Sequence, residues 1–244
     1  MEKIISYPLS FIALLLFLIT IVVFHPIQWI CFTFFGYQAH KKSVDYLNLF
    51  LVRIAHILGT TYQFDNRELL PKGVPLIIVA NHQSLYDIIG MIWFLRDFHP
   101  KFVSKKELAS GIPSVSYNLR HGGSVIIDRK DPKQAISEIK KLSDYIQKTN
   151  RTAVIFPEGT RSKTGKPKEF AQSGLKILCK YAPSAAVVPI TINNSWKFVK
   201  FGFFPFGLGN RLIFTIHKPM NVKDFSFEEI MEKTEKIIVE NIKN

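Results

Sequence analysis

The hydrophobic and polar positions of this chain alternate between short apolar runs and longer amphipathic stretches. Short apolar runs bounded by polar residues are typical of buried strands, whereas apolar positions three and four apart are typical of helices. Strands are predicted at 75–80, 101–104, 124–128, 152–156, 185–192 and 211–217, and helices at 84–97, 131–148, 170–181 and 226–242. This alternation predicts an α/β fold with a mostly parallel central sheet flanked by helices.

The beginning of the chain has a different pattern, because residues 4–40 contain no Asp, Glu, Lys or Arg. The apolar run Ile4–Phe24 would be roughly 31 Å long as a helix, enough to cross the hydrocarbon core of a bilayer. A cleaved signal peptide is disfavoured, since the run is long and no small-residue cleavage site follows it cleanly. Residues 1–60 are therefore predicted to be a membrane-associated helical region that precedes a domain at 61–244.

Two arrangements of this region remain open. Pro26 is expected to break the first helix, and residues 27–35 continue as a second apolar piece in which Trp29 suits a membrane interface. A third segment, residues 44–58, is amphipathic enough to lie on a bilayer. The region is either a single membrane span or a helical hairpin, broken at Pro26, that enters one leaflet.

The candidate chemistry begins in residues 81–87, which read Asn-His-Gln-Ser-Leu-Tyr-Asp. Positions five apart on a regular helix point about 140° away from each other, so His82 and Asp87 cannot meet inside one helix. They can meet if His82 lies in the turn after the strand and Ser84 caps the helix that contains Asp87. The pair is then a general base with its orienting carboxylate. The alternative is a structural histidine beside a charge at a helix N-terminus.

Four blocks in the chain resemble the glycerolipid acyltransferase family, and most closely the 1-acyl-sn-glycerol-3-phosphate (lysophosphatidate) acyltransferases. The blocks are His82 to Asp87, matching H-x-x-x-x-D, then Gly-Ser-Val-Ile-Ile-Asp-Arg at 123–129, Phe-Pro-Glu-Gly-Thr-Arg-Ser at 156–162, and Val-Val-Pro-Ile-Thr at 187–191. They occur in the order of the family, and the resemblance covers roughly residues 75–192. It implies that residues 61–244 form a glycerolipid acyltransferase catalytic domain.

The resemblance implies that His82 deprotonates the acceptor hydroxyl, which attacks an acyl thioester directly, without an acyl-enzyme intermediate. The residues agree, because the chain has no G-x-S-x-G motif and neither Cys31 nor Cys179 lies near the histidine motif. Spacings typical of metal ligands, such as H-E-x-x-H or C-x-x-C, do not occur, so neither a metal nor a cofactor is predicted.

The second and third blocks would hold the phosphate of the acceptor. Arg129 and Arg161 each follow a predicted strand, where a guanidinium can grip a phosphate through two hydrogen bonds. Glu158 could accept the glycerol hydroxyl or lock Arg161 in place, and Gly159 and Thr160 would complete the binding loop. The alternative makes both arginines surface charges that pair with neighbouring carboxylates.

Further segments are less specific. Lys105 matches a position of the family near the end of another strand and is predicted to stabilise phosphate or transition-state charge. Residues 187–191 are predicted to be structural. The basic segment 162–168 could touch lipid headgroups or be a solvated loop, and the aromatic stretch 198–206 could contact the bilayer, line an acyl tunnel or be ordinary core.

Charge and composition indicate the partners. The net charge is +13 and belongs to residues 41–244, since Glu2 and Lys3 cancel. A basic domain behind an apolar leader favours an anionic membrane surface, an anionic lipid, and an acidic or phosphorylated acyl donor. The resemblance implies a lyso-lipid acceptor such as lysophosphatidate and an acyl donor carried by acyl carrier protein or coenzyme A. Nucleic acid is disfavoured, because the chain has no recognised module for it. The two cysteines give no disulfide framework.

The favoured function is therefore acylation of 1-acyl-sn-glycerol-3-phosphate to phosphatidate at the cytoplasmic face of the inner membrane. One alternative acylates another lyso-lipid, such as a lyso-aminolipid. The other, from a different class, is a catalytically silent, membrane-attached lipid-binding protein.

Overall fold

A computed structural model describes residues 2–243 as an eight-stranded sheet with helices on both faces. The strands are β1 (Thr61–Asp65), β2 (Leu76–Ala80), β3 (Pro100–Lys105), β4 (Val125–Ile127), β5 (Thr152–Ile155), β6 (Ala186–Asn193), β7 (Arg211–Ile216) and β8 (Met220–Asn221). The helices are α1 (Glu2–Ile57), α2 (Leu85–Phe94), α3 (Val115–His121), α4 (Pro132–Thr149), α5 (Gln172–Tyr181) and α6 (Phe227–Glu240). All six predicted strands and four predicted helices are confirmed, whereas β1, β8 and α3 were not predicted.

The sheet is mostly parallel, as predicted. Its strand order is β1-β7-β6-β2-β5-β3-β4, and β8 pairs with β6. The strands β6, β2, β5, β3 and β4 are parallel to one another, while β1 and β7 form a parallel pair that runs against them. The carboxyl ends of the five parallel strands therefore share one edge, where α/β folds place their ligands.

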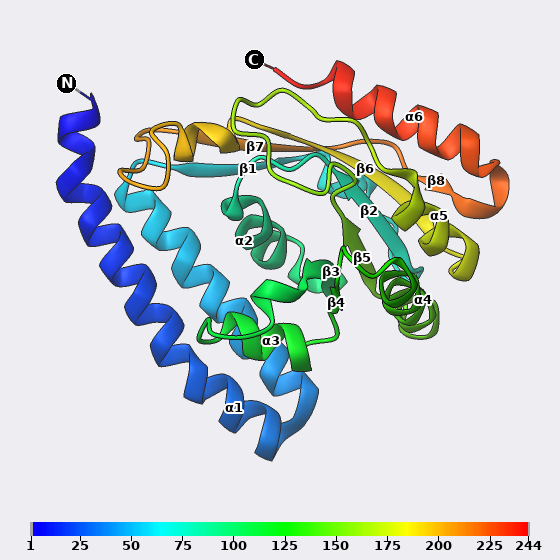
Figure 1. Cartoon of the computed structure of the whole chain (residues 1–244), viewed down its shortest axis with the longest axis horizontal. Coiled ribbons are helices and arrows are strands. Elements are labelled where there is room, and N and C mark those ends of the chain that lie inside the picture. Colours follow the sequence, from blue (N-terminus) through cyan, green and yellow to red (C-terminus); the bar gives the residue numbers. More distant parts are fainter. Residues whose placement is uncertain (1, 244) are drawn as a thin grey trace.

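Two hydrophobic cores lie on the two faces of the sheet. Along β2 every residue is buried, and alternate side chains serve opposite faces. Ile78 joins a core with α1 and α2, whereas Ile77 and Val79 join a core with α4, α5 and α6. Figure 1 shows α1, α2 and α3 on one side of the sheet and α4, α5 and α6 on the other.

The helix α1 is a hairpin of two arms, and its turn lies at Gly36 rather than at Pro26. Gly36 has φ 73° and ψ −167°, a conformation that only glycine adopts without strain. The prediction of a break at Pro26 is wrong, because the helix continues through the proline to residue 35. Figure 1 shows the first arm running to the tip of the hairpin and the second arm returning to β1. The two arms thus form a hairpin in shape, turned at Gly36.

The second arm, residues 37–57, packs on the sheet. Leu47, Leu51 and Ala55 are buried in the core that α1 shares with α2, whereas Tyr46 and Phe50 are exposed. The prediction that residues 44–58 lie on a bilayer is therefore wrong for the buried face. The same apolar spacing suits a helix on a sheet and a helix on a membrane, so the pattern alone did not separate them.

The first arm, residues 2–35, presents a long exposed apolar face. Its exposed side chains include Ile4, Phe11, Ile19, Trp29 and Phe35. The helix is apolar and long enough to cross a membrane. A continuous apolar surface of this kind on a soluble monomer would be unusual, so it indicates membrane association.

Candidate active site

His82 and Asp87 meet at the carboxyl end of β2, in the geometry predicted from their spacing. His82 lies in the turn between β2 and α2, and Asp87 lies in the first turn of α2. The His82 Nδ1 atom is 2.8 Å from Asp87 Oδ2. Because a carboxylate accepts this bond, Nδ1 carries the proton and Nε2 keeps its lone pair. Nε2 is thus the atom that can accept a proton from a substrate.

The Asp87 side chain is fixed by hydrogen bonds at the N-terminal end of α2. It is fully buried, and Oδ2 also accepts hydrogen bonds from the backbone N–H groups of Gln83 (2.7 Å) and Ser84 (2.9 Å). Ser84 caps α2, and its hydroxyl accepts a bond from the N–H of Tyr86. The capping box therefore fixes the carboxylate while the carboxylate orients the imidazole.

The third block encloses the histidine from the other side. The His82 ring stacks on Phe156 with 4.1 Å between ring centroids, and 11% of its side chain remains exposed. The Ser162 N–H donates to the carbonyl of His82 at 2.7 Å. The imidazole thus has one apolar wall, one carboxylate partner and a path to solvent.

Glu158 bonds two backbone N–H groups from different segments. One carboxylate oxygen accepts the backbone N–H of His82 at 2.8 Å, and the other accepts the backbone N–H of Lys168 at 3.0 Å. Burial raises the pKa of Glu158, and the two N–H donors oppose the rise. Among residues 2–243 no ion pair joins Glu158 to Arg161, so the predicted lock between them is not formed.

Arg129 reaches the third block. It is an exposed residue in the loop after β4, and its guanidinium donates to the carbonyl of Gly159. Gly159 has φ +67°, a conformation that side chains rarely adopt. A glycine at this position therefore lets the loop turn its carbonyl toward Arg129.

Thr160 and Arg161 lie in the exposed part of the same loop. The Lys168 ammonium donates to the Thr160 hydroxyl at 2.6 Å and to the carbonyl of Arg161 at 3.1 Å. The Arg161 side chain forms no ion pair within residues 2–243. Lys105 is exposed at the end of β3, opposite Ile127 of β4. Four cations, Lys105, Arg129, Arg161 and Lys168, thus lie at or after the carboxyl ends of β3, β4 and β5.

Sequence reasoning missed the residues that brace this edge. Gln83 accepts hydrogen bonds from the backbone N–H groups of Ser195 (2.9 Å) and Trp196 (3.3 Å) through its amide oxygen. The sequence placed Lys168 only within the basic segment 162–168. Its hydrogen bonds to the third block could not be predicted, because they depend on how that loop folds. Within residues 2–243, His, Cys, Asp and Glu side chains form no group of three or more that could hold a metal.

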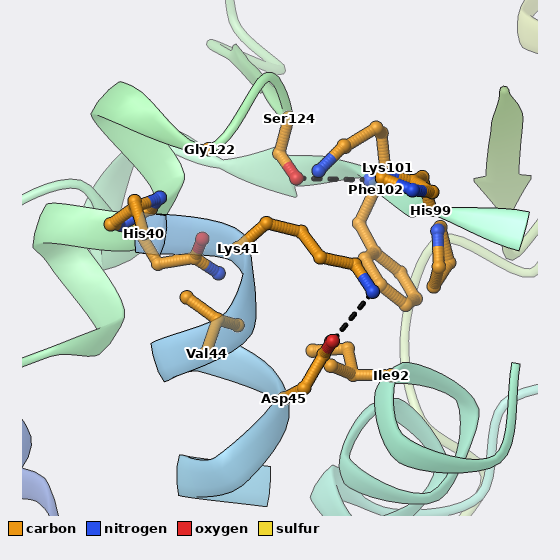
Figure 2. A pocket seen from close by; sticks show the side chains of 12 residues that line it. His40, Lys41, Val44, Asp45, Ile92, His99, Lys101, Phe102, Gly122 and Ser124 are labelled. Atoms are coloured by element: carbon orange, nitrogen blue, oxygen red, sulfur yellow. Dashed lines mark hydrogen bonds and ion pairs between the residues drawn. The ribbon is translucent and has the colours of Figure 1, made fainter. Parts of the chain in front are cut away.

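A second charged cluster lies at the opposite edge of the sheet, where β3 begins. Figure 2 shows Lys41 pointing to Asp45, with a 2.5 Å ion pair, beside His99 and Lys101. Burial lowers the pKa of Lys101 to about 7, and the nearby charge of Arg151 adds to this effect. The cavity between them is about 20 Å³, room for about one water molecule. It is too small for a lipid, so the edge with His82 remains the candidate active site.

Comparisons with known proteins show which family the chain resembles. The family model described as "Acyltransferase" matches residues 61–193. A 1-acyl-sn-glycerol-3-phosphate acyltransferase of Helicobacter pylori is 39% identical over 127 residues, which cover 49% of this chain and 51% of that protein. A chloroplastic 1-acyl-sn-glycerol-3-phosphate acyltransferase of Arabidopsis thaliana is 31% identical over 155 residues, covering 63% and 42%. The matched stretch thus spans about half the length of these relatives.

A solved structure extends the similarity to the whole fold. The crystal structure of the 1-acyl-sn-glycerophosphate (LPA) acyltransferase PlsC from Thermotoga maritima superposes with a TM-score of 0.82 at 25% sequence identity. The superposition covers 99% of this chain and 96% of that one. The similarity therefore includes the N-terminal hairpin as well as the α/β domain.

Proposed function

The chain belongs to the acyltransferase family, and we propose that it transfers a fatty acyl group from a thioester to the free hydroxyl of 1-acyl-sn-glycerol-3-phosphate, giving phosphatidate. The observation that carries this proposal is the 2.8 Å contact between His82 and Asp87, with Nε2 free, beside a cationic edge. The relatives named above act on the same class of acceptor by their names, which supports this choice of substrate.

In the proposed reaction, Nε2 of His82 takes the proton of the acceptor hydroxyl as its oxygen attacks the thioester carbonyl. The carbon–oxygen bond forms, the carbon–sulfur bond breaks, and the imidazolium returns the proton to the leaving thiolate. Asp87 stabilises the imidazolium in between. Glu158 positions the histidine by accepting its backbone N–H.

We propose that the acceptor phosphate lies against Arg129, Arg161 and Lys105. Guanidinium groups bind phosphate through two parallel hydrogen bonds. A doubly charged phosphate can also neutralise several neighbouring cations at once. The proposed donor is an acyl carrier protein or coenzyme A thioester; both are anionic and suit the basic surface. The proposed location is the cytoplasmic face of the inner membrane.

Acyl transfer by the purified, detergent-solubilised protein tests the proposal. Lysophosphatidate and a phosphate-free lyso-lipid would be offered with each of the two thioesters. Transfer to lysophosphatidate with either thioester is expected. Transfer only to the phosphate-free lipid would keep the chemistry and refute the acceptor, whereas no transfer from folded protein would favour a lipid-binding role.

A further inference from the structure

The segment between β6 and β7 carries aromatic side chains with opposite surroundings. In this aromatic loop (residues 196–208), Phe198 and Phe206 are buried in the core. Phe203 is 81% exposed. This is the largest exposed fraction among the large hydrophobic side chains of residues 2–243, and burying a phenylalanine ring away from water contributes about 1.5–3 kcal/mol.

One side of the aromatic loop is fastened to the beginning of α1. The Phe206 N–H donates to the Ser10 hydroxyl at 2.8 Å, and Lys200 pairs with Glu2 at 2.7 Å. Figure 1 shows this loop beside the N-terminal part of the first arm. The aromatic loop that carries the exposed Phe203 is therefore attached to the first arm, and both can meet the same bilayer.

The other side of the segment reaches the catalytic turn. The backbone N–H of Ser195 donates to the Gln83 amide oxygen at 2.9 Å, and the hydroxyls of Ser195 and Ser84 are 2.5 Å apart. The rings of Phe198 and Tyr86 are 3.8 Å apart between centroids. Gln83, Ser84 and Tyr86 all lie between His82 and Asp87 in sequence. A shift of the loop would therefore move the turn that holds the catalytic pair.

We propose that the aromatic loop is a second membrane-contacting element, which inserts Phe203 into the bilayer that receives the first arm and thereby steadies the catalytic turn. Lys197, whose ammonium lies over the Trp196 ring, adds a cation to this loop that suits anionic headgroups. Aromatic side chains are favoured at the boundary between headgroups and acyl chains. The proposed membrane contact is argued from the structure of the loop and does not depend on the proposed function. Its effect on turnover does rest on the proposed function.

A fluorescent label tests the contact. Phe203→Cys would be labelled with nitrobenzoxadiazole after Cys31→Ser, leaving the buried Cys179. The matched control is Ile136→Cys on α4, at a residue that is 50% exposed. In vesicles of phosphatidylcholine and phosphatidylglycerol with a quencher on the acyl chains, we expect quenching and a blue shift at 203 only. If the label at 203 shows the same emission wavelength and the same lack of quenching as the label at 136, the proposal is overturned.

Activity tests the consequence for catalysis. Phe203→Glu is expected to lower transfer to bilayer-embedded lysophosphatidate several-fold, with a smaller effect on a short-chain, water-soluble lysophosphatidate, while Ile136→Glu changes neither. Equal loss on both acceptors would overturn the role of the membrane contact. Inactivity of the unmodified protein would instead refute the proposed function and leave the labelling result to decide the contact.

Discussion

Replacing Asp87 by Asn separates the two tasks of this carboxylate. Its Oδ2 atom accepts three hydrogen bonds at 2.7–2.9 Å, one from the imidazole and two from backbone N–H groups. A bond to a charged acceptor contributes ~1.5–3 kcal/mol and a bond to a neutral one ~0.5–1.5 kcal/mol, so the change removes about 1 kcal/mol at each donor. Relief of the buried charge offsets part of this loss. We expect a net destabilisation of about 1–3 kcal/mol.

The effect of Asp87→Asn on rate should be larger. An amide does not stabilise the imidazolium that forms when His82 takes a proton, so we expect turnover to fall by about 10²–10⁴-fold. Turnover would be measured by acyl transfer, and stability by the melting temperature in detergent.

The matched control is Glu229→Gln. Glu229 closes the capping box of α6 by accepting the Ser226 N–H at 2.9 Å, far from His82 in sequence and on an exposed surface. It undergoes the same chemical change, and we expect a small loss of stability with an unchanged rate. An Asp87→Asn protein that melts lower but keeps its rate would show that the carboxylate is structural and would refute the assigned role.

Two further changes probe the charges at the two edges of the sheet. Arg129→Ala should raise the KM for the acceptor roughly tenfold or more, the loss expected for a charged hydrogen bond, with little change in the KM for the donor; Lys130→Ala is the neighbouring control, and equal loss on both substrates would contradict the role. Lys101 has a pKa of about 7 in the folded protein against 10.5 for an ordinary lysine, so the unfolded chain binds more protons between these values. Stability should therefore rise with pH from about 7 to 10.5, and Lys101→Met should remove that rise in melting experiments; parallel pH profiles would refute the assignment.

The strands and the meeting of His82 with Asp87 could be predicted because local patterns decide both. Buried parallel strands are almost wholly apolar, as β2 is, and the capping residue Ser84 marks where its helix begins. Parallel strands bring their carboxyl ends to one edge, and for that reason Lys105 and Arg129 could be predicted at the same edge of the sheet as His82.

The features that escaped prediction depend on contacts between distant segments. The two bonds of Glu158 join residues 76 and 10 positions away, and no local pattern shows them. The hairpin turned at Gly36 because glycine adopts its positive φ freely, while Pro26 was accommodated within the helix. The short strand β8 has only two residues and depends on pairing with β6.

The measurement that tests the central claim most directly is acyl transfer to lysophosphatidate by the unmodified protein and by His82→Ala. The control is His217→Ala, just after β7, where the half-buried ring bonds the Thr191 hydroxyl at 2.8 Å; that hydroxyl also contacts the Ile238 carbonyl of α6. If His82 is the general base, its replacement lowers the rate by about 10²–10⁴-fold in a protein that remains folded, while the control stays close to the unmodified rate. A His82→Ala protein that transfers acyl groups as fast as the unmodified protein would contradict the account.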